Sequence, residues 1–346
     1  MGGPRVQARH HQRGQLRLAS ARAAYRSHRH PLTHPARKAL PMSPSIQKIA
    51  MIGLGIMGSP MAVHLANAGY DVTGFDLSPQ GIEPLVDAGG RAAGSSAEAV
   101  ADADVVCIMV PDSPDVKAVL TDEGGVLASA KAGALIIDFS SIRPDVTAEL
   151  AQQAAGLGFR YLDAPVSGGE AGAKNAALSI MVGGSGEDFE AAKPLLDVVG
   201  KTVVHVGPSG SGQTVKAANQ LIVAANIQAL SEAVIFLEAY GVDTKAALEV
   251  LGGGLAGSKV LDQKKANMLS RSFEPGFRID LHHKDMGIVT SAAREAGVAV
   301  PLGALVAQLV GSARAAGDGN LDHSALLRGV ERLSGLATST STTKEN

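Results

Sequence analysis

Short apolar runs alternate with longer segments of helical character from Ile46 to about Gly207. Runs such as VVCIMV and LIIDF are apolar at nearly every position, which predicts strands that helices cover on both faces. Alternation of such strands with helices is typical of a parallel α/β sheet. The predicted strands are residues 48–55, 71–76, 104–110, 134–140, 159–166, 178–184 and 202–207.

The strand pattern stops after Gly207, and the rest of the chain has helical patterns only. One long helix is predicted from about Thr214 to Tyr240, and shorter helices follow it to about Leu333. We therefore predict an α/β domain over residues 43–208 and an all-helical domain over residues 209–335, joined by the long helix. Polar composition predicts disorder for the leader 1–42 and for the tail 336–346.

The leader is strongly basic, because it holds nine of the 31 lysines and arginines and no acidic residue. The remainder carries 22 − 33 = −11 charges. This negative charge outside the leader argues against nucleic acid as a partner. The leader fits three interpretations: an organelle transit peptide, a nucleic-acid-binding arm, or sequence without function that precedes a natural start at Met42. We favour the third, and with it a cytoplasmic protein.

Cysteine content and apolar run length argue against further classes. Cys107 is the single cysteine and lies in an apolar run, so neither an internal disulfide nor a cysteine-based metal site is expected. No apolar run approaches the ~18 residues that a membrane span needs, so no membrane partner is expected. His282 and His283 are adjacent and point apart, which argues against a metal site there.

The segment GLGIMG follows the first predicted strand and precedes a predicted helix, which is the setting of a dinucleotide-binding loop. There Gly53 allows a tight turn, Gly55 lets the main chain approach a pyrophosphate, and Gly58 lets helix and strand pack closely. The helix N-terminus would bind the phosphates. This context favours a Rossmann-type NAD(P)-binding domain over a plain turn, with cofactor contacts from Gly53, Leu54, Gly55, Ile56, Met57 and Gly58.

Asp76 ends the second predicted strand, about twenty residues after the glycine loop. An acid at this point accepts hydrogen bonds from the adenosine ribose and repels a 2′-phosphate. No arginine or lysine follows in DLSPQ to neutralise that phosphate, so NAD is favoured over NADP. The alternative is that Asp76 is only a turn residue.

Three later strand ends carry residues suited to ligand binding, and such ends meet at one edge of a parallel sheet. The N–H groups of an SGG turn are able to hold a carboxylate without an arginine. Each segment alone would be an ordinary loop, but together they predict one crevice for cofactor and substrate. The residues are Val110 and Pro111 in MVPDSPDV, Ser140 and Ser141 in SSIRP, and Ser167, Gly168 and Gly169 in DAPVSGG.

The segment GSGQTVKAANQ begins the long helix and has Lys216 in its first turns. Asn219, Gln220 and Val223 follow at i+3, i+4 and i+7, so they share a helix face with the lysine. The helix dipole and partial burial both lower the pKa of an amine at this place. Lys216 is thus a candidate proton donor; the alternative is a solvated surface lysine.

In this order, the motifs resemble the β-hydroxyacid dehydrogenase family over about residues 48–335. The segments that carry the resemblance are GLGIMGSPMAVHLANAGYDV, DAPVSGGEAGAKNAALSIMVGG, GSGQTVKAANQ and FRIDLHHKDMGI.

The resemblance implies a role for particular residues. Lys216 matches the catalytic acid/base, and Asn219 would orient the lysine or the substrate. Ser140 and the SGG turn match the residues that bind the substrate carboxylate, and Lys284 matches a lysine beside the nicotinamide. Many members have Asn where this chain has Gln220, which we interpret as a variant hydrogen-bonding partner. The resemblance also implies a homodimer or homotetramer.

Within the family, FEPGFRIDLHHKD, GGGLAGSKVL and LDHSAL resemble most the members that reduce tartronate semialdehyde to glycerate. This implies an NAD(P)-dependent oxidoreductase that acts on a small carboxylate semialdehyde or hydroxy acid. One alternative is a 3-hydroxyisobutyrate dehydrogenase, whose pocket prefers a methyl to a hydroxyl group. Another is an imine reductase, which Lys216 argues against. A non-catalytic NAD-binding or chromatin-type reader would need neither Lys216 nor the SGG turn.

Overall fold

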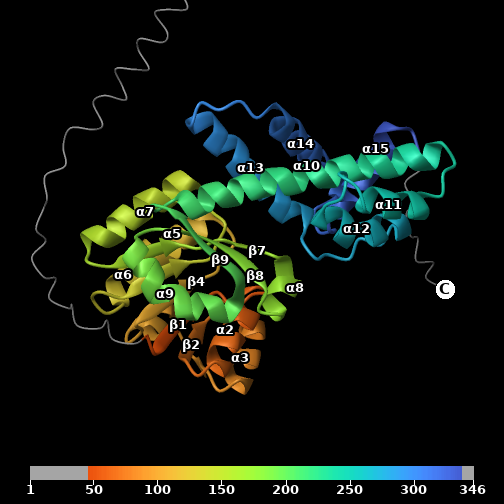
Figure 1. Cartoon of the computed structure of the whole chain (residues 1–346). Coiled ribbons are helices and arrows are strands. Elements are labelled where there is room, and N and C mark those ends of the chain that lie inside the picture. The colour runs from red at the N-terminus through yellow and green to blue at the C-terminus, as the bar shows by residue number, and fades with distance from the viewer. Residues whose placement is uncertain (1–45, 337–346) are drawn as a thin grey trace, which may run out of the picture. The chain divides into compact units, whose positions relative to one another are not determined.

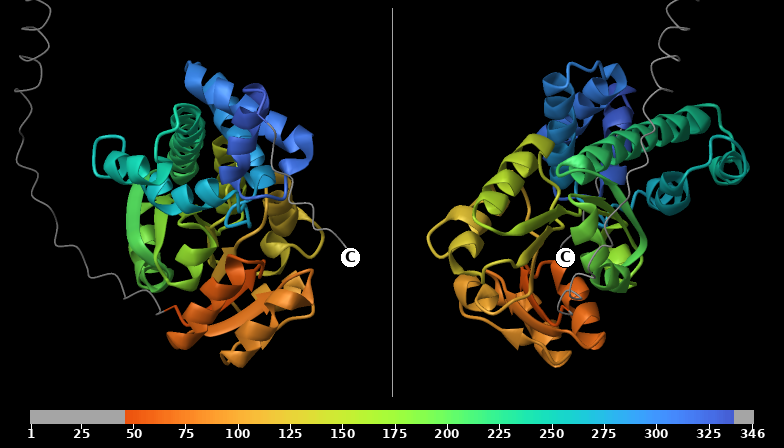
Figure 2. Two further views of the ribbon diagram at one scale, coloured as in Figure 1. Left: turned by 90° about the vertical axis from the view of Figure 1, so that its right-hand side faces the viewer. Right: turned by 60° about the vertical axis from the view of Figure 1, so that its left-hand side comes forward.

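The computed structural model of the protein describes residues 46–336 (Figure 1). The predictions for the leader 1–42, for a start at Met42 and for the tail from residue 337 onward concern residues outside this range. Within it, a sheet with helices on both faces is followed by a helical half that begins with α10 (Ser211–Ala239). In Figures 1 and 2 the sheet half runs from red to green, and the helical half from teal to blue.

All seven predicted strands have a counterpart, but the strand predicted over 159–166 is divided into β6 and the short β7, and the short β3 is additional. The sheet order is β3-β2-β1-β4-β5-β6-β8-β7, and β9 pairs with β8. The strand order reverses between β1 and β4, which is where ligands bind in open α/β sheets. The strands are β1 (Lys48–Ile52), β2 (Asp71–Phe75), β3 (Arg91–Ala92), β4 (Val105–Ile108), β5 (Leu135–Asp138), β6 (Arg160–Asp163), β7 (Val166–Ser167), β8 (Leu178–Gly183) and β9 (Gly200–Gly207).

The sheet is mixed, whereas the sequence pattern predicts a parallel one. β8 runs antiparallel to β6 and β7, and the pairs from β3 to β6 and the pair β8–β9 are parallel. The cause is the short connection of residues 168–177 between β7 and β8, which contains only the six-residue helix α8 (Gly169–Lys174). A parallel return would need a longer crossover.

Separate helical layers bury the two faces of the sheet. In β4, Val105 and Cys107 pack toward α2 and α9, whereas Val106 and Ile108 pack toward α5 and α7. All four are fully buried, as the prediction of doubly covered strands requires. Burial raises the pKa of the Cys107 thiol to about 12. The helices here are α2 (Gly58–Asn67), α3 (Glu83–Asp87), α4 (Ser96–Val100), α5 (Ser113–Thr121), α6 (Val126–Ser129), α7 (Pro144–Gly156) and α9 (Gly186–Val199), with η1 (Pro79–Gly81).

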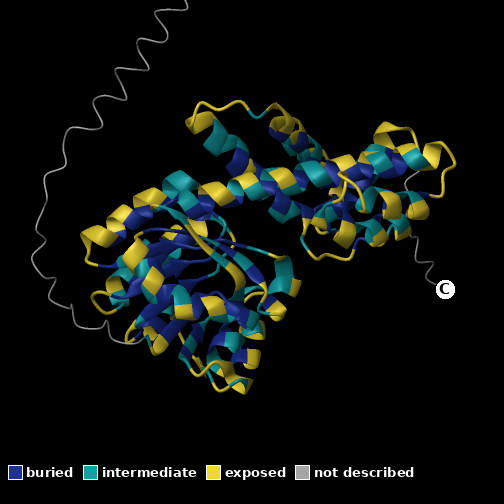
Figure 3. Cartoon of the chain, viewed as in Figure 1, coloured by how far each residue is buried: buried dark blue, intermediate teal, exposed yellow. Residues whose placement is uncertain are grey.

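α10 is the central helix of the helical half. By length and composition α10 would be able to cross a membrane, although the sequence analysis finds no apolar run of that length. The buried side of α10 packs into one core with α11 to α15 (Figure 3). Ile227 and Val234 of α10 belong to this core. The other elements are α11 (Thr244–Gly252), α12 (Lys259–Ser270), α13 (Ile279–Glu295), α14 (Pro301–Ala313), η2 (Arg314–Asp318), η3 (His323–Ala325) and α15 (Leu326–Leu333).

Candidate active site

The loop between β1 and α2 has the space that a dinucleotide needs. Gly53 has φ +92°, and a Cβ there would overlap the carbonyl group of Met109 at the end of β4. A Cβ on Gly58 would overlap the carbonyl oxygen of Gly53, whereas a Cβ on Gly55 would meet nothing within 4 Å. The first turn of α2 has no side-chain cap and no acidic residue, so no side chain there competes with a phosphate. The loop therefore fits an NAD(P) pyrophosphate.

Asp76 is joined directly to this loop. Its Oδ2 accepts a hydrogen bond from Leu54 N at 2.6 Å, and its Oδ1 accepts one from Ser78 N at 2.7 Å. The carboxylate is thereby held beside the glycine loop. Three apolar residues of the loop differ in exposure: Leu54 is buried, Met57 is half-buried and Ile56 is exposed. Of these, Ile56 therefore offers its side chain to a ligand.

The two serines after β5 face different surroundings. Ser140 is fully buried; its Oγ accepts a hydrogen bond from Val110 N at 3.0 Å, and its N donates to Asp138 Oδ1 at 2.9 Å. Ser141 lines the cleft that contains Lys216. The predicted substrate residue Ser140 therefore has its hydroxyl engaged inside the fold, and Ser141 is the serine at the cleft.

The start of α10 is fastened to the ends of β5 and β6. Oδ1 of Asp163 accepts a hydrogen bond from Gly210 N at 2.8 Å, and Oδ2 accepts one from Gln213 N at 3.0 Å. The Gln213 side chain donates to Ser140 O at 2.8 Å and accepts from Ile142 N at 3.1 Å. These contacts satisfy the first N–H groups of the helix and fix the position of the turn that carries Lys216.

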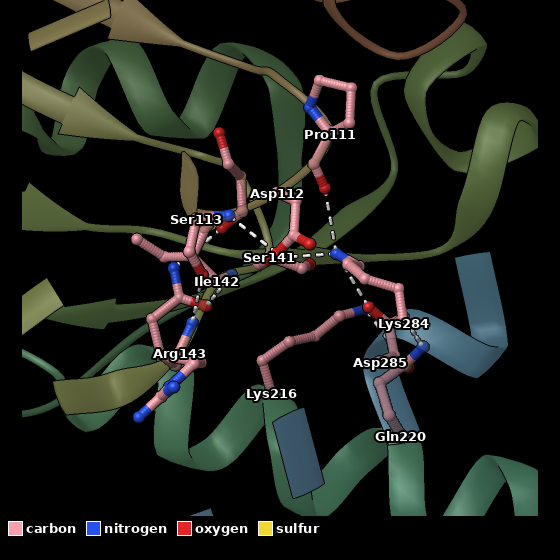
Figure 4. A network of polar contacts seen from close by, with 12 residues as sticks. Pro111, Asp112, Ser113, Ser141, Ile142, Arg143, Lys216, Gln220, Lys284 and Asp285 are labelled. Atoms are coloured by element: carbon pink, nitrogen blue, oxygen red, sulfur yellow. Dashed lines mark hydrogen bonds and ion pairs between the residues drawn. The ribbon is translucent and has the colours of Figure 1, made fainter. Parts of the chain in front are cut away.

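Lys216 projects from α10 into a small cleft between the two halves (Figure 4). The residue is only 8% exposed, and its Nζ donates hydrogen bonds to Val166 O at 2.8 Å and to Gln220 Oε1 at 3.2 Å. Burial lowers its pKa; Asp285 opposes this change and Lys284 reinforces it. Such a perturbed amine in a cleft is suited to acid/base chemistry. Other residues lining the cleft are Ser141, Ile142, Gln213, Ala217, Gln220, Asp285 and Ile288.

Gln220 connects Lys216 with its neighbours. Its Oε1 accepts a second hydrogen bond, from Asn219 Nδ2 at 2.8 Å, and its Nε2 donates to Asp285 Oδ2 at 2.5 Å. Gln220 is buried and Asn219 is half-buried. The structure thus brings together the three polar residues that the helical spacing places on one face.

Lys284 on α13 reaches from the helical half to the sheet half. Its Nζ donates hydrogen bonds to Ser141 O at 2.6 Å and to Pro111 O at 3.0 Å, and it forms an ion pair with Asp285 at 3.0 Å. Figure 4 shows these contacts beside Lys216. Lys284 therefore lies at the two strand ends predicted to contact the cofactor.

The SGG turn lies next to Lys216 on the sheet side. Ser167 directly follows Val166, whose carbonyl group accepts the hydrogen bond from the lysine. Gly168 and Gly169 have φ values of +134° and +62°, which favour glycine at both positions. A Cβ on Gly169 would lie 3.8 Å from Gly276 O, so the loop 273–277 faces this turn.

Asp322 holds the loop 273–277 in place. Its Oδ2 accepts hydrogen bonds from Gly276 N and Phe277 N, each at 3.0 Å, and forms an ion pair with Lys264 at 2.9 Å. Burial alone would raise the pKa of Asp322, but His323, Ser324 and Lys264 lower it to about 2. The carboxylate thus stays ionised and able to hold the loop.

Two histidines of the helical half, His282 and His323, form a buried pair. Nδ1 of His282 lies 3.1 Å from Nδ1 of His323, so one of the two must donate and the other accept. His283 is not part of this pair. Among residues 46–336 there is no group of three or more His, Cys, Asp or Glu side chains that would hold a metal ion.

Four residues that organise the site are not identified by the sequence pattern: Asp163, Gln213, Asp285 and Asp322. Each acts through a hydrogen bond to a residue far away in the sequence, and such a pair leaves no periodic pattern. The one available signal is adjacency to a motif residue, since Asp285 directly follows Lys284 and Asp163 begins DAPVSGG.

Two family models match the chain. Residues 48–207 match the NAD binding domain of 6-phosphogluconate dehydrogenase. Residues 210–330 match the model described as NAD-binding of NADP-dependent 3-hydroxyisobutyrate dehydrogenase.

Individual relatives match over most of their length. The 2-hydroxy-3-oxopropionate reductase of Escherichia coli (strain K12) is 43% identical over 82% of this chain and 97% of its own. The NAD-dependent L-serine dehydrogenase of Pseudomonas aeruginosa is 36% identical over 76% of this chain and 91% of its own. The solved structure of Mycobacterium tuberculosis 3-hydroxyisobutyrate dehydrogenase with L-serine has a TM-score of 0.76 and 33% identity, and the match covers 82% of this chain and 99% of that one. The chain thus belongs to the NAD(P)-dependent β-hydroxyacid dehydrogenase family.

Proposed function

We propose that this protein reduces tartronate semialdehyde (2-hydroxy-3-oxopropionate) to glycerate, with Lys216 as the acid/base. The observation that carries the proposal is the buried amine of Lys216 in a small cleft, between the strand ends and α13. The 43% identity to the E. coli 2-hydroxy-3-oxopropionate reductase supports this choice of substrate.

In this proposal, different residues at the cleft bind the two ends of the substrate. N–H groups of the turn 167–169 hold the carboxylate, because this turn adjoins Lys216 and its two glycines have positive φ. Ser141 lines the cleft, and we propose that its hydroxyl group adds a hydrogen bond to the substrate. The aldehyde carbon then lies toward the strand ends at Pro111 and Ser141, where Lys284 is bound.

Lys216 moves the proton of the reaction. When bound, the nicotinamide supplies the hydride to the aldehyde carbon, and the glycine loop and Asp76 hold the dinucleotide. The ammonium form of Lys216 polarises the carbonyl group and donates a proton to its oxygen as negative charge develops there. The reverse reaction needs the neutral amine as a base. Gln220 and Asn219 orient the amine through the shared Oε1.

Gln220 also favours a substrate that carries a hydroxyl group. Its Oε1 already accepts two hydrogen bonds, and one N–H of its amide donates to Asp285. We propose that the second N–H of this amide donates to a hydroxyl group of the substrate. The second candidate is 3-hydroxyisobutyrate dehydrogenase activity, which the apolar side chains of Ile142 and Ile288 in the same cleft favour, since they suit a methyl group.

Steady-state oxidation of NADH and NADPH with three semialdehydes tests the proposed substrate. We expect kcat/KM for tartronate semialdehyde to exceed that for methylmalonate semialdehyde and succinate semialdehyde by about tenfold or more, since a site that donates to a hydroxyl group discriminates against its absence. A preference for methylmalonate semialdehyde would replace the proposal with the second candidate. No turnover of any of the three would refute both.

The cofactor in this proposal is NAD, because Asp76 adds a negative charge beside the glycine loop. Leu77, the next residue, is 95% exposed and is replaceable without loss of packing. We expect Asp76→Ser with Leu77→Arg to raise the ratio of kcat/KM for NADPH to that for NADH by about tenfold or more, since a cation replaces an anion near the 2′-phosphate. Leu77→Arg alone is the control. An unchanged ratio in the double variant would contradict the role of Asp76.

We also propose a cytoplasmic homo-oligomer that assembles through the helical half. Large apolar side chains remain exposed along α10 and α14, which supports an interface between copies. They are Ile222, Phe236, Leu302 and Leu305, with exposed fractions of 57–62%. The single buried cysteine supports a reducing compartment.

A further inference from the structure

Asp285 connects the two parts of the polar network around Lys216. It is 3% exposed and lies on α13, one residue after Lys284. Its Oδ1 forms the ion pair with Lys284 at 3.0 Å, and its Oδ2 accepts the hydrogen bond from Gln220 Nε2 at 2.5 Å. One carboxylate therefore contacts both the lysine that reaches the strand ends and the glutamine that contacts Lys216.

The carboxylate determines which way the Gln220 amide points. With Oε1 toward Lys216 and Asn219, both donors find an acceptor, and Nε2 finds one in Asp285. The reversed amide would turn an NH2 group toward an ammonium group and an oxygen toward a carboxylate. Asp285 thus keeps an acceptor directed at Nζ of Lys216.

The charge of Asp285 also acts on Lys216. Burial disfavours the ammonium form, and so does the positive charge of Lys284. Asp285 favours the ammonium form and so opposes both. His282, on the same helix, also interacts with Lys216, and burial lowers the pKa of His282, which keeps its ring neutral.

We propose that Asp285 is the positioning residue of this site: it fixes the Gln220 amide toward Lys216, and its negative charge maintains the ammonium form that reduction requires. The substrate does not need to touch Asp285 for either effect. The inference rests on the proposed acid/base role of Lys216 and adds the group that sustains it.

The pH dependence of kcat/KM tests the charge effect in the full-length protein. Reduction requires the ammonium form, so activity falls as pH rises through the pKa of Lys216. In Asp285→Asn and in Asp285→Ser this alkaline limb should move to lower pH by about one unit or more, because an opposite charge has been removed. In Lys284→Gln the limb should move to higher pH. A general loss of structure would not produce shifts of opposite sign.

A matched control lies on the same helix. Asp280→Asn also removes an acidic residue from α13, but Asp280 pairs with Arg314 and its side chain is 40% exposed. We expect Asp280→Asn to leave the alkaline limb where it is in the unchanged protein. Thermal unfolding followed by circular dichroism checks that each variant is folded.

A second readout does not depend on turnover. Competitive acetylation with acetic anhydride, followed at Lys216 by mass spectrometry over a range of pH, measures the neutral fraction of its amine. We expect the midpoint to fall in Asp285→Asn and Asp285→Ser and to rise in Lys284→Gln. An unchanged midpoint in a folded variant that lacks the Asp285 charge would overturn the inference. If the midpoints shift although no semialdehyde is reduced, the proposed substrate class fails and the role of Asp285 stands.

Discussion

Lys216→Met should lower kcat for semialdehyde reduction by about 10²- to 10⁴-fold, the range that general acid catalysis contributes. Methionine keeps most of the buried side chain but is unable to donate a proton to the substrate oxygen. The affinity for NADH, measured by fluorescence titration, should change by less than about twofold, because Lys216 lies in the cleft and not in the glycine loop.

A lysine on the surface serves as the control for this substitution. Lys259 on α12 has a side chain that is 92% exposed, so Lys259→Met should leave kcat unchanged.

Because burial lowers the pKa of Lys216, the rate of reduction should begin to fall at a lower alkaline pH than it would with a solvated lysine. Oxidation of glycerate should gain activity over the same interval, since it requires the neutral amine. Retained turnover in Lys216→Met would refute the mechanism.

A pair of glycine substitutions should separate stability from cofactor binding. Gly53→Ala should lower the free energy of unfolding by about 2–6 kcal/mol, from backbone strain at φ +92° together with overlap against Met109. Gly55→Ala should change it by less than about 0.5 kcal/mol, because nothing lies within 4 Å of the added carbon. That carbon would instead occupy the space where the pyrophosphate approaches, so we expect the Kd for NADH to rise by about tenfold or more.

Urea unfolding and calorimetric titration with NADH measure the two quantities in the same variants. If Gly55→Ala binds NADH as tightly as the unchanged protein, the open space above Gly55 is not the pyrophosphate site. If Gly53→Ala unfolds at the same urea concentration as the unchanged protein, the close approach of β1 and β4 tolerates a side chain after all.

Local patterns predict most of this fold. The seven strands and the long helix follow from runs of apolar residues and helical spacing, which depend on neighbours in the sequence. The shared face of Lys216, Asn219 and Gln220 is likewise a matter of helical spacing, and the structure has all three in hydrogen-bonded contact.

Strand direction and side-chain orientation are harder to predict. The antiparallel β8 depends on how few residues connect it to β7, and its apolar sequence is compatible with either direction. Ser140 and Ser141 are chemically the same, and which one reaches the cleft is decided by contacts with Val110 and Gln213, 30 and 73 residues away from Ser140.

The fastening of α10 by Asp163 and Gln213 has a mechanical consequence. The 29 residues of this helix span about 43 Å, and Lys216 lies only about 8 Å from the end that Asp163 holds. A tilt of about 5° around that fixed end would displace the far end by almost 4 Å but the lysine by less than about 1 Å. Lys216, the proposed acid/base, lies close to the pivot, so the far end of α10 is able to shift while the position of Lys216 stays nearly constant.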